Sequence, residues 1–194
     1  MIHKLQQTAT RLLDTSYVGR FLLRMIVFYL VFRSINWLWV GLVTPEGYYS
    51  SFIDQYLDYV NVVKFSILKV GTLFSSVVGV PAIFINDSLV QVSNGGQIEM
   101  AWACCGLEIM SFWAAFVLAD TTSKSVKLWW GLGGLFCLWF INCCRIMLLL
   151  LAKEYRWEQL LNLDQHFLFN VVAYSFVFML MYVYYRKNKY ALGS

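Results

Sequence analysis

A cysteine placed where a turn meets an apolar segment is the first candidate for chemistry. Cys104 stands in ACCGLE, residues 103–108, between a polar, turn-rich stretch and the start of a hydrophobic helix. The unpaired N–H groups and the positive dipole end of a helix start favour the thiolate, which is the nucleophilic form of cysteine. Cys104 is therefore a candidate nucleophile. The alternative is a small packing residue, a common role of cysteine in apolar helices.

Two polar residues in later apolar segments could assist such a thiol. Arg145 lies in NCCRI, residues 142–146, about 12 Å along a helix from Lys153 at its outer end. A charge inside an apolar span is costly, so Arg145 indicates either a function or a structural ion pair with Glu108. His166 opens the last apolar segment, where it is either functional or an ordinary interfacial histidine.

The composition is that of a membrane protein. Of the 194 residues, 60% are hydrophobic and 13% are charged, and the mean hydropathy is +0.61. The net charge of +4 comes from short basic clusters beside apolar segments, which indicate membrane topology rather than nucleic-acid binding. The five cysteines form no C-x-x-C pair, so we expect no disulfide framework, no metal site and no cofactor.

The elements that must position these residues are mostly transmembrane helices. We expect an all-α integral membrane protein with a single polytopic domain over residues 1–190 and a tail over 191–194, where Gly193-Ser194 would be left from cloning. A short interfacial helix over 3–16 precedes the first span, and no cleavable signal peptide is expected. Arg33, inside the first span, should face protein or water. The four expected spans cover residues 21–43, 104–119, 128–151 and 165–185.

The segment at residues 54–78 is amphipathic rather than uniformly apolar, so we expect it to lie on the outer membrane surface. Its expected apolar face comprises Tyr56, Tyr59, Val60, Val63, Ile67, Val70, Phe74 and Val77, and its expected polar face Asp54, Asp58, Asn61, Lys64, Lys69, Thr72 and Ser76. The alternative is a fifth span over 55–78.

Residues 79–103 change to a period of two, which predicts a small extracytoplasmic β-meander leading into the Cys104 helix. Strands are expected over 82–85, 89–93 and 97–102, separated by the turn sequences Asn86-Asp87-Ser88 and Asn94-Gly95-Gly96. Open strand edges are not tolerated in hydrocarbon, so the meander should lie outside the bilayer.

The charges flanking the four spans orient them. The positive-inside rule places both termini and the basic 120–127 loop in the cytoplasm, and the acidic-leaning 44–103 region outside. Cys104, Arg145 and His166 come from three different spans, yet this topology brings all of them to the outer leaflet. A fifth span would place the basic N-terminus outside, against the rule.

Together these motifs carry a family resemblance. ACCGL at 103–107, N-x-x-R-I at 142–146 and a histidine opening the last span resemble the exosortase/archaeosortase family of polytopic membrane cysteine transpeptidases. The resemblance covers about residues 70–185. It implies that Cys104 is the nucleophile, Arg145 the essential arginine and His166 the essential histidine. It also implies a site on the outer face of the bacterial inner (cytoplasmic) membrane.

The implied substrate is a secreted protein that ends in a short motif, a hydrophobic span and a basic tail, which is cleaved and transferred to an envelope acceptor. Cys104 would attack the scissile carbonyl, Arg145 would stabilise negative charge, and His166 would protonate the leaving amine. Glu108, one helical turn after Cys104, is expected to orient Arg145 or His166, as are Asn142 and Asn170. Membrane lipid is the other expected partner, and nucleic acid is not.

Two rival functions remain open. One is a non-enzymatic membrane scaffold or assembly factor of the envelope, in which the meander binds a partner and the polar residues form a structural network. The other is a thiol-redox protein that uses Cys104-Cys105 or Cys143-Cys144, although disulfides between adjacent cysteines are strained. Cys105 points about 100° away from Cys104 on a helix, which indicates a packing residue.

Overall fold

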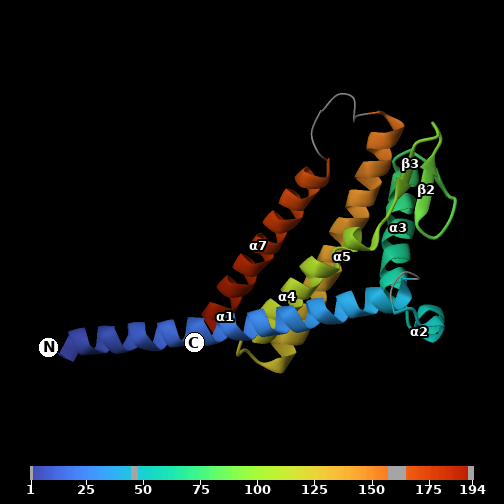
Figure 1. Ribbon diagram of the computed structural model, residues 1–194. Helices are drawn as coiled ribbons and strands as arrows, with labels where there is room; N and C mark the ends of the chain where they lie inside the picture. The colour runs from blue at the N-terminus through green and yellow to red at the C-terminus, as the bar shows by residue number, and fades with distance from the viewer. Residues whose placement is uncertain (1, 45–47, 157–164, 192–194) are drawn as a thin grey trace.

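Helices make up most of the protein (Figure 1). The computed structural model describes residues 2–44, 48–156 and 165–191, with side-chain surroundings for 18–44, 48–156 and 171–187. The elements in chain order are α1 (Ile2–Val43), α2 (Ser51–Tyr56), α3 (Tyr59–Val77), β1 (Ala82–Phe84), β2 (Leu89–Val92), β3 (Gln97–Glu99), the 3₁₀ turn η1 (Trp102–Cys105), α4 (Leu107–Ala119), α5 (Lys124–Glu154) and α7 (Gln165–Ala191).

The N-terminal part of the chain forms one helix rather than two. The separate helix expected over 3–16 is wrong, because α1 runs without a break through that segment and the first expected span. Gly19 is the residue there that disfavours helix most, and one interior glycine costs only about 1 kcal/mol. The helix ends at Val43, and the hydroxyl of the next residue, Thr44, donates a hydrogen bond of 2.7 Å to the carbonyl of Val40.

α3 packs closely across α5, and this contact changes the face that is buried. A Cβ atom on Gly71 would lie 2.6 Å from Cβ of Ile146, so only glycine allows this approach. The buried side chains of α3 therefore include Thr72 and Ser75 beside Ile67, whereas Val77 is 79% exposed. The sequence assigns Thr72 to the polar face and Val77 to the apolar face, whereas the packing of α5 buries Thr72 and leaves Val77 exposed.

The three strands of the expected β-meander are confirmed, but the third ends at Glu99 rather than at residue 102, because Trp102 already belongs to the turn η1. The strand order is β1-β2-β3, both pairs are antiparallel, and Val90 lies opposite Phe84 and Ile98. The first turn is held by Asn86, whose Oδ1 accepts from the N–H groups of Ser88 and Leu89 at 2.8 Å.

One hydrophobic core joins the sheet to α3 and α5. Val90 and Val92 of β2 are buried in it with Ile67 of α3 and Leu150 of α5. At the sheet's far turn, Nδ2 of Asn94 donates to the carbonyls of Lys153 and Glu154 at 2.9 and 2.8 Å. The sheet is thereby attached to the C-terminal end of α5.

α4 and α5 form a tight hairpin that α7 covers. Trp113 of α4 lies against Gly134 of α5, where a Cβ atom would overlap the indole ring. The indole N–H donates to the carbonyl of Trp130 at 3.2 Å. Trp113 is fully buried in a second core that includes Val177 and Tyr184 of α7.

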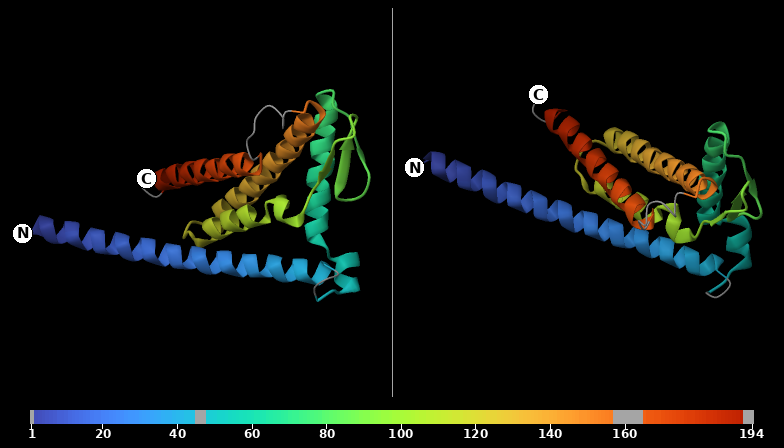
Figure 2. Two further views of the ribbon diagram at one scale, coloured as in Figure 1. Left: turned by 45° about the horizontal axis from the view of Figure 1, so that its top comes forward. Right: turned by 90° about the horizontal axis from the view of Figure 1, so that it is seen from above.

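Among the described residues, three helical segments are long and apolar enough to cross a membrane, namely Val18–Val43, Ser51–Val77 and Lys124–Glu154. The expected span at 104–119 is shorter, because α4 begins only at Leu107 and has 13 residues, or about 20 Å. The span expected at 165–185 lies on α7, whose first side chains are outside the described residues. Figure 2 shows that α3 runs at a steep angle to α1 rather than beside it.

Candidate active site

Cys104 lies in the turn before α4 rather than at the first residue of that helix. It belongs to η1, and its N–H donates to the carbonyl of Ala101 at 2.9 Å. Gly106 then takes a left-handed conformation, with φ of 73°, and α4 begins at Leu107. The expectation that the thiol occupies the N-terminus of this α-helix is corrected, because the left-handed residue separates the 3₁₀ turn from the helix.

Asn142 of α5 packs directly on this turn. A Cβ atom on Gly106 would lie 2.5 Å from Nδ2 of Asn142, so both the backbone angle and the space require glycine. Nδ2 of Asn142 also donates to the carbonyl of Leu138 at 3.1 Å, which fixes the amide. Asn142 therefore contacts the cysteine turn, while its expected role in orienting Arg145 or His166 stays a prediction.

The two adjacent thiols have different surroundings. Cys105 is fully buried, and its Sγ lies 3.8 Å from the carbonyl oxygen of Ala101. Cys104 is only half-buried at the edge of the first core. The five cysteines are not bonded to one another in this structure.

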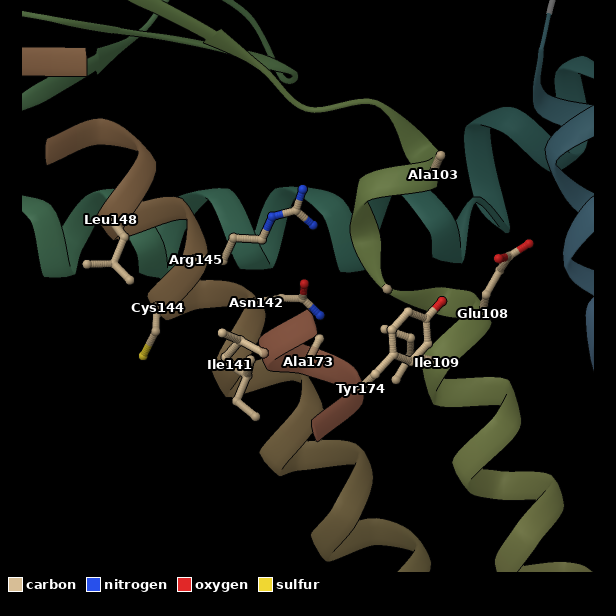
Figure 3. Close-up of a pocket in the computed structure, with 12 residues that line it drawn as sticks. Ala103, Glu108, Ile109, Ile141, Asn142, Cys144, Arg145, Leu148, Ala173 and Tyr174 are labelled. Atoms are coloured by element: carbon tan, nitrogen blue, oxygen red, sulfur yellow. The ribbon is translucent and has the colours of Figure 1, made fainter. Parts of the chain in front are cut away.

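A pocket of about 330 Å³ lies beside the turn (Figure 3). Its lining comes from four elements: Ala103 and Gly106 from the turn, Glu108 and Ile109 from α4, Ile141, Asn142, Cys144, Arg145 and Leu148 from α5, and Val172, Ala173 and Tyr174 from α7. Cys104 is flanked by lining residues but does not itself line the pocket. Segments about forty residues apart in sequence therefore meet at the cysteine turn.

Arg145 extends from α5 toward the turn that carries Ala103 (Figure 3). Its Nε atom is buried. Cys144 also lines the pocket but points away from Arg145.

Glu108 does not take up the expected position beside Arg145. Its Oε1 lies 3.7 Å from Nη2 of Arg33, and its carboxylate points away from Arg145 in Figure 3. Arg33 of α1 therefore faces a carboxylate of α4, as expected of a charge inside an apolar segment. Both side chains remain more than half exposed, so this pair is not a buried one.

The remaining expected site residues lie on α7. His166 and Asn170 belong to its first two turns, and their side chains are outside the described residues. Figure 2 shows the N-terminal end of α7 near η1. Ala173, about two turns after His166, lines the pocket.

Two features of the site were missed by sequence reasoning. Tyr174 lines the pocket and also a neighbouring hollow of about 250 Å³, which continues from Glu108 and Ile109 along Tyr29, Phe112, Val177 and Phe178. The spacing of Tyr174 four residues after Asn170 was a usable signal.

The second missed feature is a polar network that joins three helices. Asn36 of α1 donates to Ser111 of α4 at 2.8 Å and accepts from the hydroxyl of Tyr59 of α3 at 2.6 Å. These bonds tie α1 and α3 to the helix that follows the cysteine turn. These three residues are far apart in the sequence, so no local sequence pattern predicts that they form hydrogen bonds with one another.

No family model, curated protein or solved structure matches the chain.

Proposed function

We propose that the protein is an exosortase-like membrane cysteine transpeptidase with Cys104 as its nucleophile. The observation that carries the proposal is the single pocket bordered by the Cys104 turn, Asn142 and Arg145. A half-exposed thiol, a cation with paired donors and an adjoining hollow are the parts that acyl transfer to sulfur requires.

In the proposed membrane arrangement α1, α4, α5 and α7 cross the bilayer, and α3 lies along its outer surface. α3 begins near the C-terminal end of α1 and runs away from it at a steep angle, which supports this arrangement (Figure 2). The basic residues at the other end, Lys124, Lys127 and Lys187, fit a cytoplasmic location. Because α4 is short, the Cys104 turn would lie within the outer leaflet, beneath the sheet.

The proposed reaction has two steps. The Cys104 thiolate attacks the scissile carbonyl, and Arg145 stabilises the tetrahedral oxyanion with its guanidinium N–H groups. As the C–N bond breaks, His166 gives its proton to the leaving amine, and a thioester remains on Cys104. His166 then takes a proton from the acceptor nucleophile, which attacks the thioester and releases the thiolate.

The proposed substrate is a secreted protein whose C-terminal end has a short motif, a hydrophobic span and a basic tail. The basic tail would stay in the cytoplasm for the same reason as Lys124 and Lys187, so the motif would reach the depth of Cys104. The apolar hollow along Phe112, Val177 and Phe178 adjoins the pocket and offers a surface for the hydrophobic span.

Labelling with a peptidyl chloromethyl ketone tests this proposal. We expect mass spectrometry of the labelled full-length protein to find the adduct on Cys104, in the wild type and in Cys105→Ser. Absence of labelling would favour the scaffold function. Labelling that appears only after a reductant is added would favour the redox function.

A further inference from the structure

A second hollow lies at the opposite end of α4 from the cysteine turn. It has a volume of about 310 Å³ and runs between α4 and α5. We call it the α4–α5 groove, and it is lined by Ala114, Val117, Leu118, Lys124, Lys127, Leu128, Gly131, Leu132 and Leu135. Apart from its two lysines the lining is apolar, and Leu118, Leu128 and Leu132 are exposed along its walls.

Both lysines stand at one end of the groove, where α5 begins. Nζ of Lys127 donates to the carbonyl of Leu118 at 3.1 Å, so the ammonium is held at the end of α4. An ammonium has three donors, and Lys124 adds a second exposed cation one turn away. The nearby Asp120 carboxylate accepts from Tyr184 at 2.6 Å and from Thr122 at 2.9 Å, which directs it toward α7.

The α4–α5 groove is deep at Gly131, because this lining residue has no side chain to fill it. A Cβ atom on Gly131 would meet only Cγ1 of Val117, at 4.0 Å. Gly133 of the same helix has nothing within 4 Å and does not line the groove. A larger side chain at Gly131 would therefore fill the groove, and the same side chain at Gly133 would not.

We propose that the α4–α5 groove binds an anionic phospholipid, with one acyl chain against Gly131 and the phosphate against Lys124 and Lys127. An apolar trough with cations at one end matches a molecule that has a long hydrocarbon chain and a net negative headgroup. Inorganic phosphate has no part that would occupy the trough, and a zwitterionic lipid gains less from the two charges. This site is independent of the proposed enzymatic function.

Native mass spectrometry of the full-length protein with equimolar phosphatidylglycerol and phosphatidylcholine tests the charges. We expect wild-type protein to retain phosphatidylglycerol preferentially. Lys124→Gln/Lys127→Gln should weaken that retention roughly 30-fold, since each lysine near an anionic headgroup strengthens binding roughly five-fold. Arg186→Gln/Lys187→Gln removes the same net charge at the same end of the molecule and should retain the lipid. Equal losses in both double variants, or equal retention of both lipids by the wild type, would overturn the site.

The trough is tested with a matched pair of glycine variants. Gly131→Leu should lose the preferential retention, whereas Gly133→Leu should keep it, with the thermal unfolding of each lipid-free variant measured as a check on folding. If Gly131→Leu folds and binds as the wild type does, the acyl chain does not occupy the groove. If Gly131→Leu fails to fold, Gly131→Ala is tested in its place, with a smaller expected loss of lipid retention. If Gly131→Ala retains phosphatidylglycerol as well as the wild type does, the acyl chain does not occupy the groove.

Discussion

Nδ2 of Asn142 occupies the space that a side chain on Gly106 would need, 2.5 Å from the position of its Cβ atom. Gly106 ends the turn that carries Cys104, and Asn142 lies one helical turn before Arg145. The contact therefore sets the distance between the candidate nucleophile and the candidate cation.

Gly106→Ala should disrupt this contact. A left-handed residue other than glycine costs about 1–2 kcal/mol, and the clash with Asn142 adds to it. We expect a lower free energy of unfolding and loss of Cys104 labelling. The matched control is Gly133→Ala, which has helical surroundings and open space and should be neutral or stabilising by up to about 1 kcal/mol.

Adding Asn142→Ala to Gly106→Ala separates the two causes. The second substitution removes the clash but not the backbone strain, so the double variant should recover part of the lost stability. No recovery in a denaturation measurement would show that Asn142 does not restrain the turn.

The parts of the fold that depend on residues close together in the sequence were predictable. The meander follows from alternating apolar residues between Asn86 and Asn94 turns, and the α4–α5 hairpin from a polar loop between apolar segments. The buried face of α3 was not predictable, because it depends on where α5 crosses at Gly71.

The candidate site divides in the same way. The motifs around Cys104 and Arg145 predicted two segments that the structure brings to one pocket. The choice of Arg33 rather than Arg145 beside Glu108 depends on how α1 packs on α4, which no spacing within one segment specifies.

The different burial of the two adjacent thiols predicts a difference in alkylation. Cys105 is fully buried, so a reagent does not reach its thiol in the folded protein. Iodoacetamide at pH 8 should leave Cys105 unmodified in the folded protein and modify it in the denatured protein. In the folded Cys104→Ala variant, mass spectrometry can assign a modification at this site to Cys105 alone. Rapid modification of Cys105 there would contradict its burial.

The partner of Glu108 can be identified with a double-mutant cycle on stability. Because Nη2 of Arg33 lies 3.7 Å from Oε1 of Glu108, Arg33→Gln and Glu108→Gln should show a stabilising coupling. The cycle between Arg145→Gln and Glu108→Gln should show less. A larger coupling to Arg145 would restore the ion pair that the sequence suggested.

The membrane arrangement predicts which positions a water-soluble thiol reagent reaches in intact cells. In a variant lacking the native cysteines, single cysteines at Asn94 and Arg156 should react from outside, and those at Lys124 and Lys189 only after permeabilisation. External reaction at Lys124 would contradict the orientation. Cytoplasmic reaction at Asn94 would place the meander, and the candidate site with it, on the wrong side.

Arg145→Lys decides whether the arginine acts in the reaction or only in the fold. Lysine keeps the charge but loses the planar pair of donors and the reach of the guanidinium, so the variant should fold and still lose most of its turnover. Loss of one oxyanion donor typically lowers the rate by about 10²–10³. The measurement compares cleavage of a co-expressed protein that carries a motif, hydrophobic span and basic tail with thermal unfolding of the purified variant. A structural arginine would give the opposite pair of results: the variant would unfold at a lower temperature, while the surviving molecules would remain fully active.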